Sequence, residues 1–179
     1  MKSSIGEKIA LEHQAAKLFM RLYQHKFGIK MQHIWHNEPA KPDVSCYLEQ
    51  QRLDLEIAHL YGSEAEAMKI LGRELKGGTL DALQSLTQFP VAERLLQALD
   101  KLISNKAQKS YDSEKVWLVI RNAHPDWHAE ELAQTPHLLK IPPKHPFEQI
   151  WLVADMTGQA GLVPLYPLTL AESLTEKGV

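Results

Sequence analysis

The sequence predicts one α/β domain with a central mixed β-sheet flanked by helices. Along the 179 residues, segments with helical periodicity are interleaved with segments of strand-like alternation, as in mixed architectures. Two apolar runs in the C-terminal half have the continuous hydrophobicity of strands that are buried on both faces. The share of hydrophobic residues, 44%, and of charged residues, 23%, is that of a globular chain and argues against disorder.

Charge and cysteine content exclude several classes of protein. The 20 basic and 22 acidic residues give a net charge of −2, which excludes binding of nucleic acid by bulk charge but leaves room for a local basic patch. The single cysteine, Cys46, excludes a disulfide framework and a multi-cysteine zinc site. No apolar run is long enough to span a membrane, so we expect a cytoplasmic protein without a membrane partner. The sequence does not determine the oligomeric state, and a homodimer is one of the possibilities.

The N-terminal third is predicted to form a long helix and then three strands. Ser4 and Glu7 form a capping box before a helix from about residue 5 to 27. The apolar stripe of this helix contains an acid, Glu12, whose burial without a partner would be costly. Alternating apolar residues then indicate strands. The expected strand positions are 31–35, 43–48 and 53–57.

The remaining residues are predicted to alternate between helices and buried strands. A second capping box, Ser63 with Glu66, opens a helix that ends before Gly77. Further helices are expected at about 79–86, at 90–109, and in short form at 127–133 within the long loop 122–147. Strands are expected at 115–121 and 148–156, with an edge strand at 162–165. We assign residues 1–179 to one domain, with a core at about 5–156 and a C-terminal extension at 157–179.

Acidic residues gather around the second and third strands. Alternation in the third strand points Asp54 and Glu56 to the same face. The hairpin between these strands brings Asp43 towards Glu56 across the ladder. Converging carboxylates repel each other unless a cation neutralises them, and oxygen ligands of this kind suit Mg²⁺ or Mn²⁺. Such an ion would polarise a phosphodiester and activate a water molecule.

The order of these features resembles the PD-(D/E)XK, or restriction-endonuclease-like, superfamily over roughly residues 5–121. The features are a helix, the pair Pro42-Asp43, a hairpin, an acid-x-acid motif and a lysine-bearing helix before a buried strand. The resemblance implies a restriction-endonuclease-like core and a metal-dependent endonuclease that hydrolyses DNA phosphodiester bonds. It also implies Mg²⁺ or Mn²⁺ as the cofactor and DNA as the partner.

Carried over residue by residue, the resemblance makes Asp43 the first acid and Glu12 the acid of the first helix. The second motif has two placements. If Asp54 is its acid, Glu56 stands where the motif has its lysine. If Glu56 is its acid, Ala58 stands at the position of the lysine. The implied metal ligands are therefore Asp43, Asp54, Glu56 and Glu12.

Neither placement supplies the lysine of the motif. Some members of the superfamily carry this lysine on a neighbouring helix, and Lys106 and Lys109 extend the inward stripe of the helix at 90–109. The implied catalytic residues are Asp43, Glu56, Lys106 and Lys109. The alternative function is a catalytically inactive nuclease-fold module that binds nucleic acid or a protein partner.

Each of these residues also has a structural explanation. Asp43 and Glu56 could be solvated carboxylates on the outer face of a two-stranded edge. Glu12 could be paired with Arg52 or Lys26. The two lysines could extend to water at the helix C-terminus, where cations interact favourably with the helix dipole.

Overall fold

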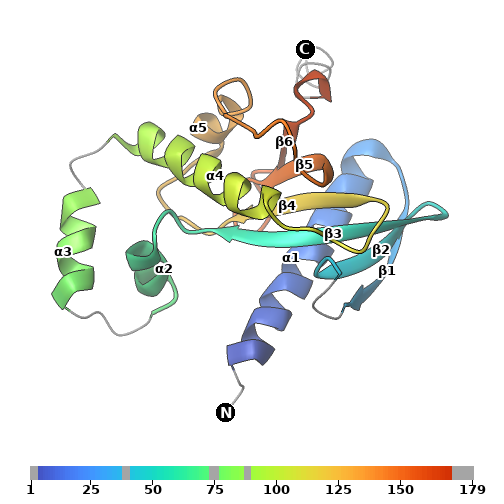
Figure 1. Ribbon diagram of the computed structural model, residues 1–179, viewed down its shortest axis with the longest axis horizontal. Coiled ribbons are helices and arrows are strands. Elements are labelled where there is room, and N and C mark those ends of the chain that lie inside the picture. The colour runs from blue at the N-terminus through green and yellow to red at the C-terminus, as the bar shows by residue number, and fades with distance from the viewer. Residues whose placement is uncertain (1–3, 38–40, 73–76, 87–89, 171–179) are drawn as a thin grey trace.

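The protein is described by a computed structural model for residues 4–37, 41–72, 77–86 and 90–170. Six strands form one sheet in the order β1-β2-β3-β4-β5-β6, and helices lie on both of its faces (Figure 1). The general α/β class, with a mixed sheet flanked by helices, is therefore confirmed. Among the described residues, no helix has the length and apolar character needed to cross a membrane.

The elements follow the predicted order. The helices are α1 (Ser4–Phe27), α2 (Glu64–Ile70), α3 (Gly77–Leu86), α4 (Val91–Ala107) and α5 (Ala129–Ala133). The strands are β1 (Met31–His36), β2 (Val44–Leu48), β3 (Gln51–Leu60), β4 (Val116–Asn122), β5 (Phe147–Val153) and β6 (Leu162–Tyr166).

The sheet combines two kinds of pairing. β1, β2 and β3 form an antiparallel meander, whereas β3, β4 and β5 are parallel and β6 returns antiparallel to β5. The parallel strands are joined through helices, as the geometry of such connections requires. β5 ends at Val153 rather than at 156, and β6 carries the sheet past the boundary expected for the core.

The capping box predicted for α2 forms only in part. Ser63 is the N-cap, and its hydroxyl accepts a hydrogen bond of 3.2 Å from the Glu66 backbone amide. The Glu66 carboxylate is buried and pairs with Arg94 and, at 2.8 Å, with Nε2 of His124. A buried carboxylate needs charged or donor partners, and here tertiary contacts provide them. The side chain of Ser4, on which the other capping box depends, lies outside the described residues.

α1 covers one face of the sheet with aromatic side chains. Phe19 and Tyr23 pack against Trp117 of β4 and Trp151 of β5, with ring centroids 6.3 Å apart for Phe19–Trp117 and 5.7 Å apart for Tyr23–Trp151. These tilted and edge-to-face contacts are the favourable arrangements of aromatic pairs. The cluster anchors the C-terminal half of α1 on the central strands.

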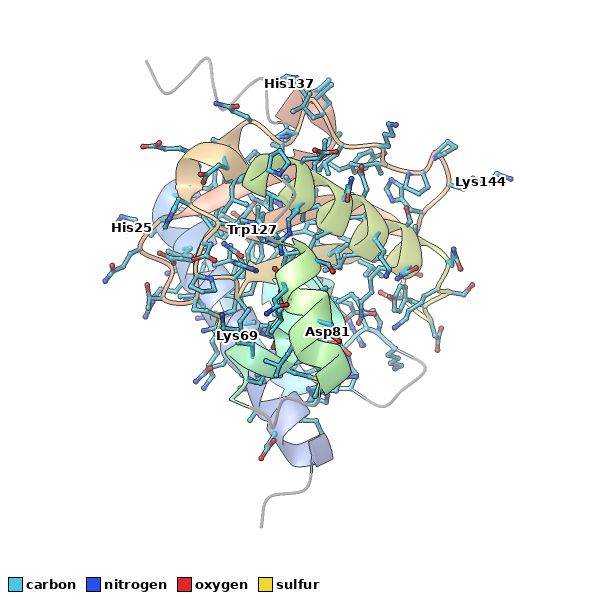
Figure 2. The ribbon with its side chains drawn as sticks, turned by 90° about the vertical axis from the view of Figure 1, so that its left-hand side faces the viewer. His25, Lys69, Asp81, Trp127, His137 and Lys144 are labelled. Carbon is cyan, nitrogen blue, oxygen red and sulfur yellow. The ribbon has the colours of Figure 1, made fainter. Side chains whose placement is uncertain are left out.

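α4 covers the opposite face. Its stripe of Leu95, Leu99 and Ile103 is fully buried in the cluster that includes Leu118 and Ile150. α2 and α3, which Figure 2 marks by Lys69 and Asp81, contact each other beside this layer. α3 lies at the end of the molecule opposite β1 and β2 (Figure 1).

Leu99→Ala tests the contribution of α4 to the fold. The Leu99 side chain is fully buried, so its truncation leaves a cavity and should lower the free energy of unfolding by about 2–5 kcal/mol. Leu80→Ala on α3 is the matched control, since Leu80 is 48% exposed and should change stability by less than about 0.5 kcal/mol. Urea denaturation measures both, and equal losses would contradict the assigned packing of α4.

Candidate functional site

β2 accompanies β3 for only part of its length. The pairing with β2 ends at Leu55 of β3, whereas the pairing with β4 continues to Leu60. Asp43 directly precedes β2, and its Oδ2 accepts a hydrogen bond of 2.9 Å from the Ile57 amide. A carboxylate thus takes the place of a backbone partner at the point where the two strands separate.

The Asp43 and Glu56 carboxylates are hydrogen-bonded to each other. Glu56 is 3% exposed and Asp43 is half-buried. Burial, the hydrogen bond with Glu56 and the charge of Glu56 raise the pKa of Asp43 to about 8, and the charge of Glu12 adds to the rise. The Ile57 amide acts in the opposite direction. Because two adjacent carboxylates cannot both be ionised at low cost, the pair holds one proton at neutral pH.

Glu56 is surrounded by donors. Burial alone would raise its pKa, but the hydrogen bond from Asp43, the charges of Lys106 and Lys109 and the hydroxyl of Tyr111 outweigh burial and lower the pKa. The Glu56 Oε2 atom lies 3.4 Å from Lys106 Nζ and 3.9 Å from Lys109 Nζ, and it accepts a hydrogen bond from Tyr111. Both lysines therefore point towards Glu56. The stripe of the helix predicts this for Lys106, but α4 ends at Ala107, so Lys109 lies just beyond the helix to which it was assigned.

Glu12 is buried on α1 with 6% exposure. Its carboxylate lies 3.7 Å from Lys8 Nζ and 3.6 Å from His36 Nε2. Its partners are thus not Arg52 or Lys26, the two considered from the sequence. Lys8 lies one helical turn before Glu12 on α1. His36 reaches Glu12 because β1 packs on α1, and local sequence patterns do not indicate this contact.

Asp54 has a different environment from Glu56. Its Oδ1 accepts from the Ser45 hydroxyl at 2.5 Å and from Arg52 Nε at 3.1 Å, and its Oδ2 accepts from the Ser113 hydroxyl at 2.5 Å. Both oxygens are therefore occupied by protein donors, and Asp54 ties the hairpin to the segment before β4. Asp54 and Glu56 do share a face, and that face is buried. The explanation of Asp43 and Glu56 as solvated carboxylates of a two-stranded edge is therefore wrong for Glu56, which is buried on the third strand of a six-stranded sheet, whereas Asp43 is half-buried.

The structure brings together four of the predicted site residues: Asp43, Glu56, Lys106 and Lys109. Glu12 lies close enough for its charge to act on Asp43. Within the described ranges, no group of three or more His, Cys, Asp or Glu side chains is arranged to hold a metal ion.

Sequence reasoning missed Tyr111 and His36. Tyr111 lies between α4 and β4, in a polar segment without periodicity, and it reaches Glu56 because the parallel crossover ends beside β3. His36 ends β1 and meets Glu12 only through the packing of β1 on α1. A local pattern signals neither contact.

Comparison of this chain with protein-family models, with curated proteins and with solved structures finds no match. The site is therefore interpreted from its own geometry and chemistry.

The raised pKa of Asp43 predicts a specific dependence of stability on pH. Between about pH 5 and 8 the folded protein keeps a proton that the unfolded chain releases, so this group makes stability fall as pH rises, by at most about 1.4 kcal/mol per pH unit. Asp43→Asn keeps a donor towards Glu56 and an acceptor for the Ile57 amide but removes this proton. Urea denaturation in EDTA should therefore show the variant gaining stability relative to wild type as pH rises.

Histidines also titrate in this window, so the informative quantity is the difference between wild type and variant at each pH. Asp81→Asn, on exposed α3, is the control and should stay parallel to wild type. A constant difference between wild type and Asp43→Asn would contradict the shared proton.

Proposed function

We propose that the chain is a metal-dependent endonuclease of the PD-(D/E)XK type that hydrolyses DNA phosphodiester bonds. The contact between the Asp43 and Glu56 carboxylates beside Lys106 carries this proposal. It favours Glu56 rather than Asp54 as the acid of the second motif, because Asp54 is occupied by other donors. A helix, a hairpin with paired acids and a lysine-bearing helix before a parallel strand also follow each other in the order that the resemblance requires.

The donor set suits a hard divalent cation. Asp43 and Glu56 would hold Mg²⁺ or Mn²⁺, and Glu12 is a further carboxylate whose charge acts on Asp43. The proton that the two acids share is the group such a cation would replace. A bound cation of this kind polarises a phosphoryl oxygen and lowers the pKa of a coordinated water.

The remaining side chains have distinct tasks in this proposal. Lys106 is mostly buried, and its ammonium group is held by Glu56, so it can stabilise negative charge that develops on the phosphate. Tyr111 fixes the Glu56 carboxylate by hydrogen bonding. Lys109 is 55% exposed and is suited to attracting the DNA backbone.

One observation favours the alternative, a catalytically inactive module that binds nucleic acid or a protein partner. Lys106, Lys109 and Tyr111 already satisfy Glu56 without a metal. A charge that is paired in this way does not need a cation. The response to Mn²⁺ separates the two functions.

Binding of Mn²⁺ should stabilise the wild type and not the acid variants. With Mn²⁺ at about 100 times its dissociation constant, the gain in unfolding free energy is about 2.7 kcal/mol. Asp43→Ala and Glu56→Ala should lose this gain and the cleavage of plasmid and linear DNA. Thermal melting with and without EDTA measures the first effect, and gel electrophoresis the second.

Asp81→Ala, at the far end of the molecule on α3 (Figure 1), is the control and should behave as wild type. If the wild type gains no stability from Mn²⁺ or Mg²⁺ but binds DNA in a salt-dependent manner, the inactive module replaces the nuclease. If Glu56→Ala cuts DNA as well as wild type, the activity does not come from this site.

Lys106→Ala separates catalysis from metal binding. Loss of a group that stabilises developing charge should lower kcat by about 10²–10³-fold, whereas the stabilisation by Mn²⁺ should persist because both carboxylates remain. Lys101→Ala, an exposed position on the same helix, is the matched control. If kcat is unchanged in Lys106→Ala, Lys106 has no catalytic role, and Lys109 becomes the candidate for that role.

A further inference from the structure

A groove of about 460 Å³ continues from the candidate site along the second half of β3. α1 lines one side with Leu11 and Glu12, and α4 lines the other with Leu102 and Lys106. β3 contributes His59 and its neighbours between these helices. Lys106, which pairs with Glu56, and Glu12, whose charge acts on Asp43, both line the groove, so the groove adjoins the candidate site.

The groove exists because β2 stops early. Beyond Leu55, no strand among the described residues pairs with this edge of β3. The carbonyl of Leu60 points towards β4 and accepts a hydrogen bond of 3.0 Å from the amide of Ala123, the residue that follows β4. Backbone groups of successive strand residues alternate in direction, so the amide and carbonyl of His59 point to the open edge, on the same side as the Ile57 amide that binds Asp43.

Two aromatic rings line this groove. The His59 and Tyr61 rings are nearly parallel, with an interplanar angle of 22° and centroids 6.1 Å apart. Burial, with a contribution from the charge of Arg121, lowers the pKa of His59 to about 4, so the ring is neutral at physiological pH. Its Nε2 is buried and has no hydrogen-bond partner within the described part of the chain, and such atoms call for a partner.

We propose that this groove binds one unpaired nucleotide of a DNA strand, with its base against the His59 and Tyr61 rings. The inference rests on the proposed function, which places the adjoining phosphate at a cation held by Asp43 and Glu56. Proteins that bind single strands combine cationic groups along the backbone with aromatic rings on which bases stack, and here Lys8 and Lys106 line the same groove.

The shape of the groove selects the substrate class. Helices wall it on both sides, and the bases of a duplex lie inside the stack, where a recessed site cannot reach them. The substrate is therefore single-stranded DNA or an unpaired end. An open strand edge also fits a peptide in β-conformation, but the ring pair and the continuity with the acids and Lys106 favour a nucleotide.

Fluorescence anisotropy in EDTA tests the groove without hydrolysis. The probes are a short labelled single strand, the same strand with abasic sites and its blunt duplex. Wild type should bind the natural strand about tenfold more tightly than the abasic strand, which corresponds to the stacking of one base, and more tightly than the duplex. His59→Ala and Tyr61→Leu should reduce the preference for bases to near unity, and Tyr61→Phe should keep it.

His137→Ala is the matched control, because His137 is exposed and lies at the end of the molecule opposite the N-terminal end of α1 (Figure 2). Equal affinity of wild type for natural and abasic strands, or tighter binding of the duplex, would overturn the inference. A second result would also overturn the inference. If an alternating Val-Thr peptide slows the hydrogen exchange of the His59 amide and the oligonucleotide does not, the groove binds a peptide.

These readouts separate the two proposals. A protein that discriminates bases as expected but neither binds Mn²⁺ nor cleaves DNA contradicts the proposed function and keeps the nucleotide groove. A protein that cleaves DNA through Asp43 and Glu56 without discriminating bases keeps the function and contradicts the groove.

Discussion

The hydrogen bond from the Ile57 amide to the Asp43 carboxylate governs both the candidate site and the groove beside it. It marks the point where β2 leaves β3, and it holds the Asp43 side chain against Glu56. A backbone partner at this position would continue the ladder and close the edge of β3. A carboxylate partner instead leaves the edge open and places a second acid at the start of the opening. The strand geometry that brings the acids together thus also creates the space beside them.

Buried acids connect the elements of this fold. Each of three such carboxylates on β3 or α2 is matched by donors from a distant part of the chain, since an unpaired buried charge is strongly destabilising. Glu56 draws the end of α4 and the following segment to β3. Asp54 fixes the hairpin to the segment before β4. Glu66 joins α2 to α4 and to His124 after β4. Of these three, Glu56 alone contacts another carboxylate, and this distinguishes a candidate site from structural ion pairs.

Much of this arrangement could be predicted from local patterns. The approach of Asp43 to Glu56 follows from hairpin register, which a short turn restricts to few choices. The inward direction of Lys106 follows from the helical stripe of Leu99 and Ile103. The burial of Glu56 could not be predicted in the same way, because alternation shows which residues share a face but not whether other elements cover that face. The contacts of Tyr111 depend on a parallel crossover, so no short-range signal indicates them.

The sequence by itself determined the order of the elements, the hairpin that pairs the acids and the stripe that carries Lys106, because these depend on periodicities within single segments. Only the tertiary structure decided which carboxylates meet each other and which meet protein donors. That outcome depends on the coverage of β3 by β4 and α4, which joins residues about fifty positions apart in the chain. It also depends on where β2 stops, since this leaves His59 and Tyr61 beside an open strand edge. Desolvation and charge pairing act across such distances, and a local pattern does not report them.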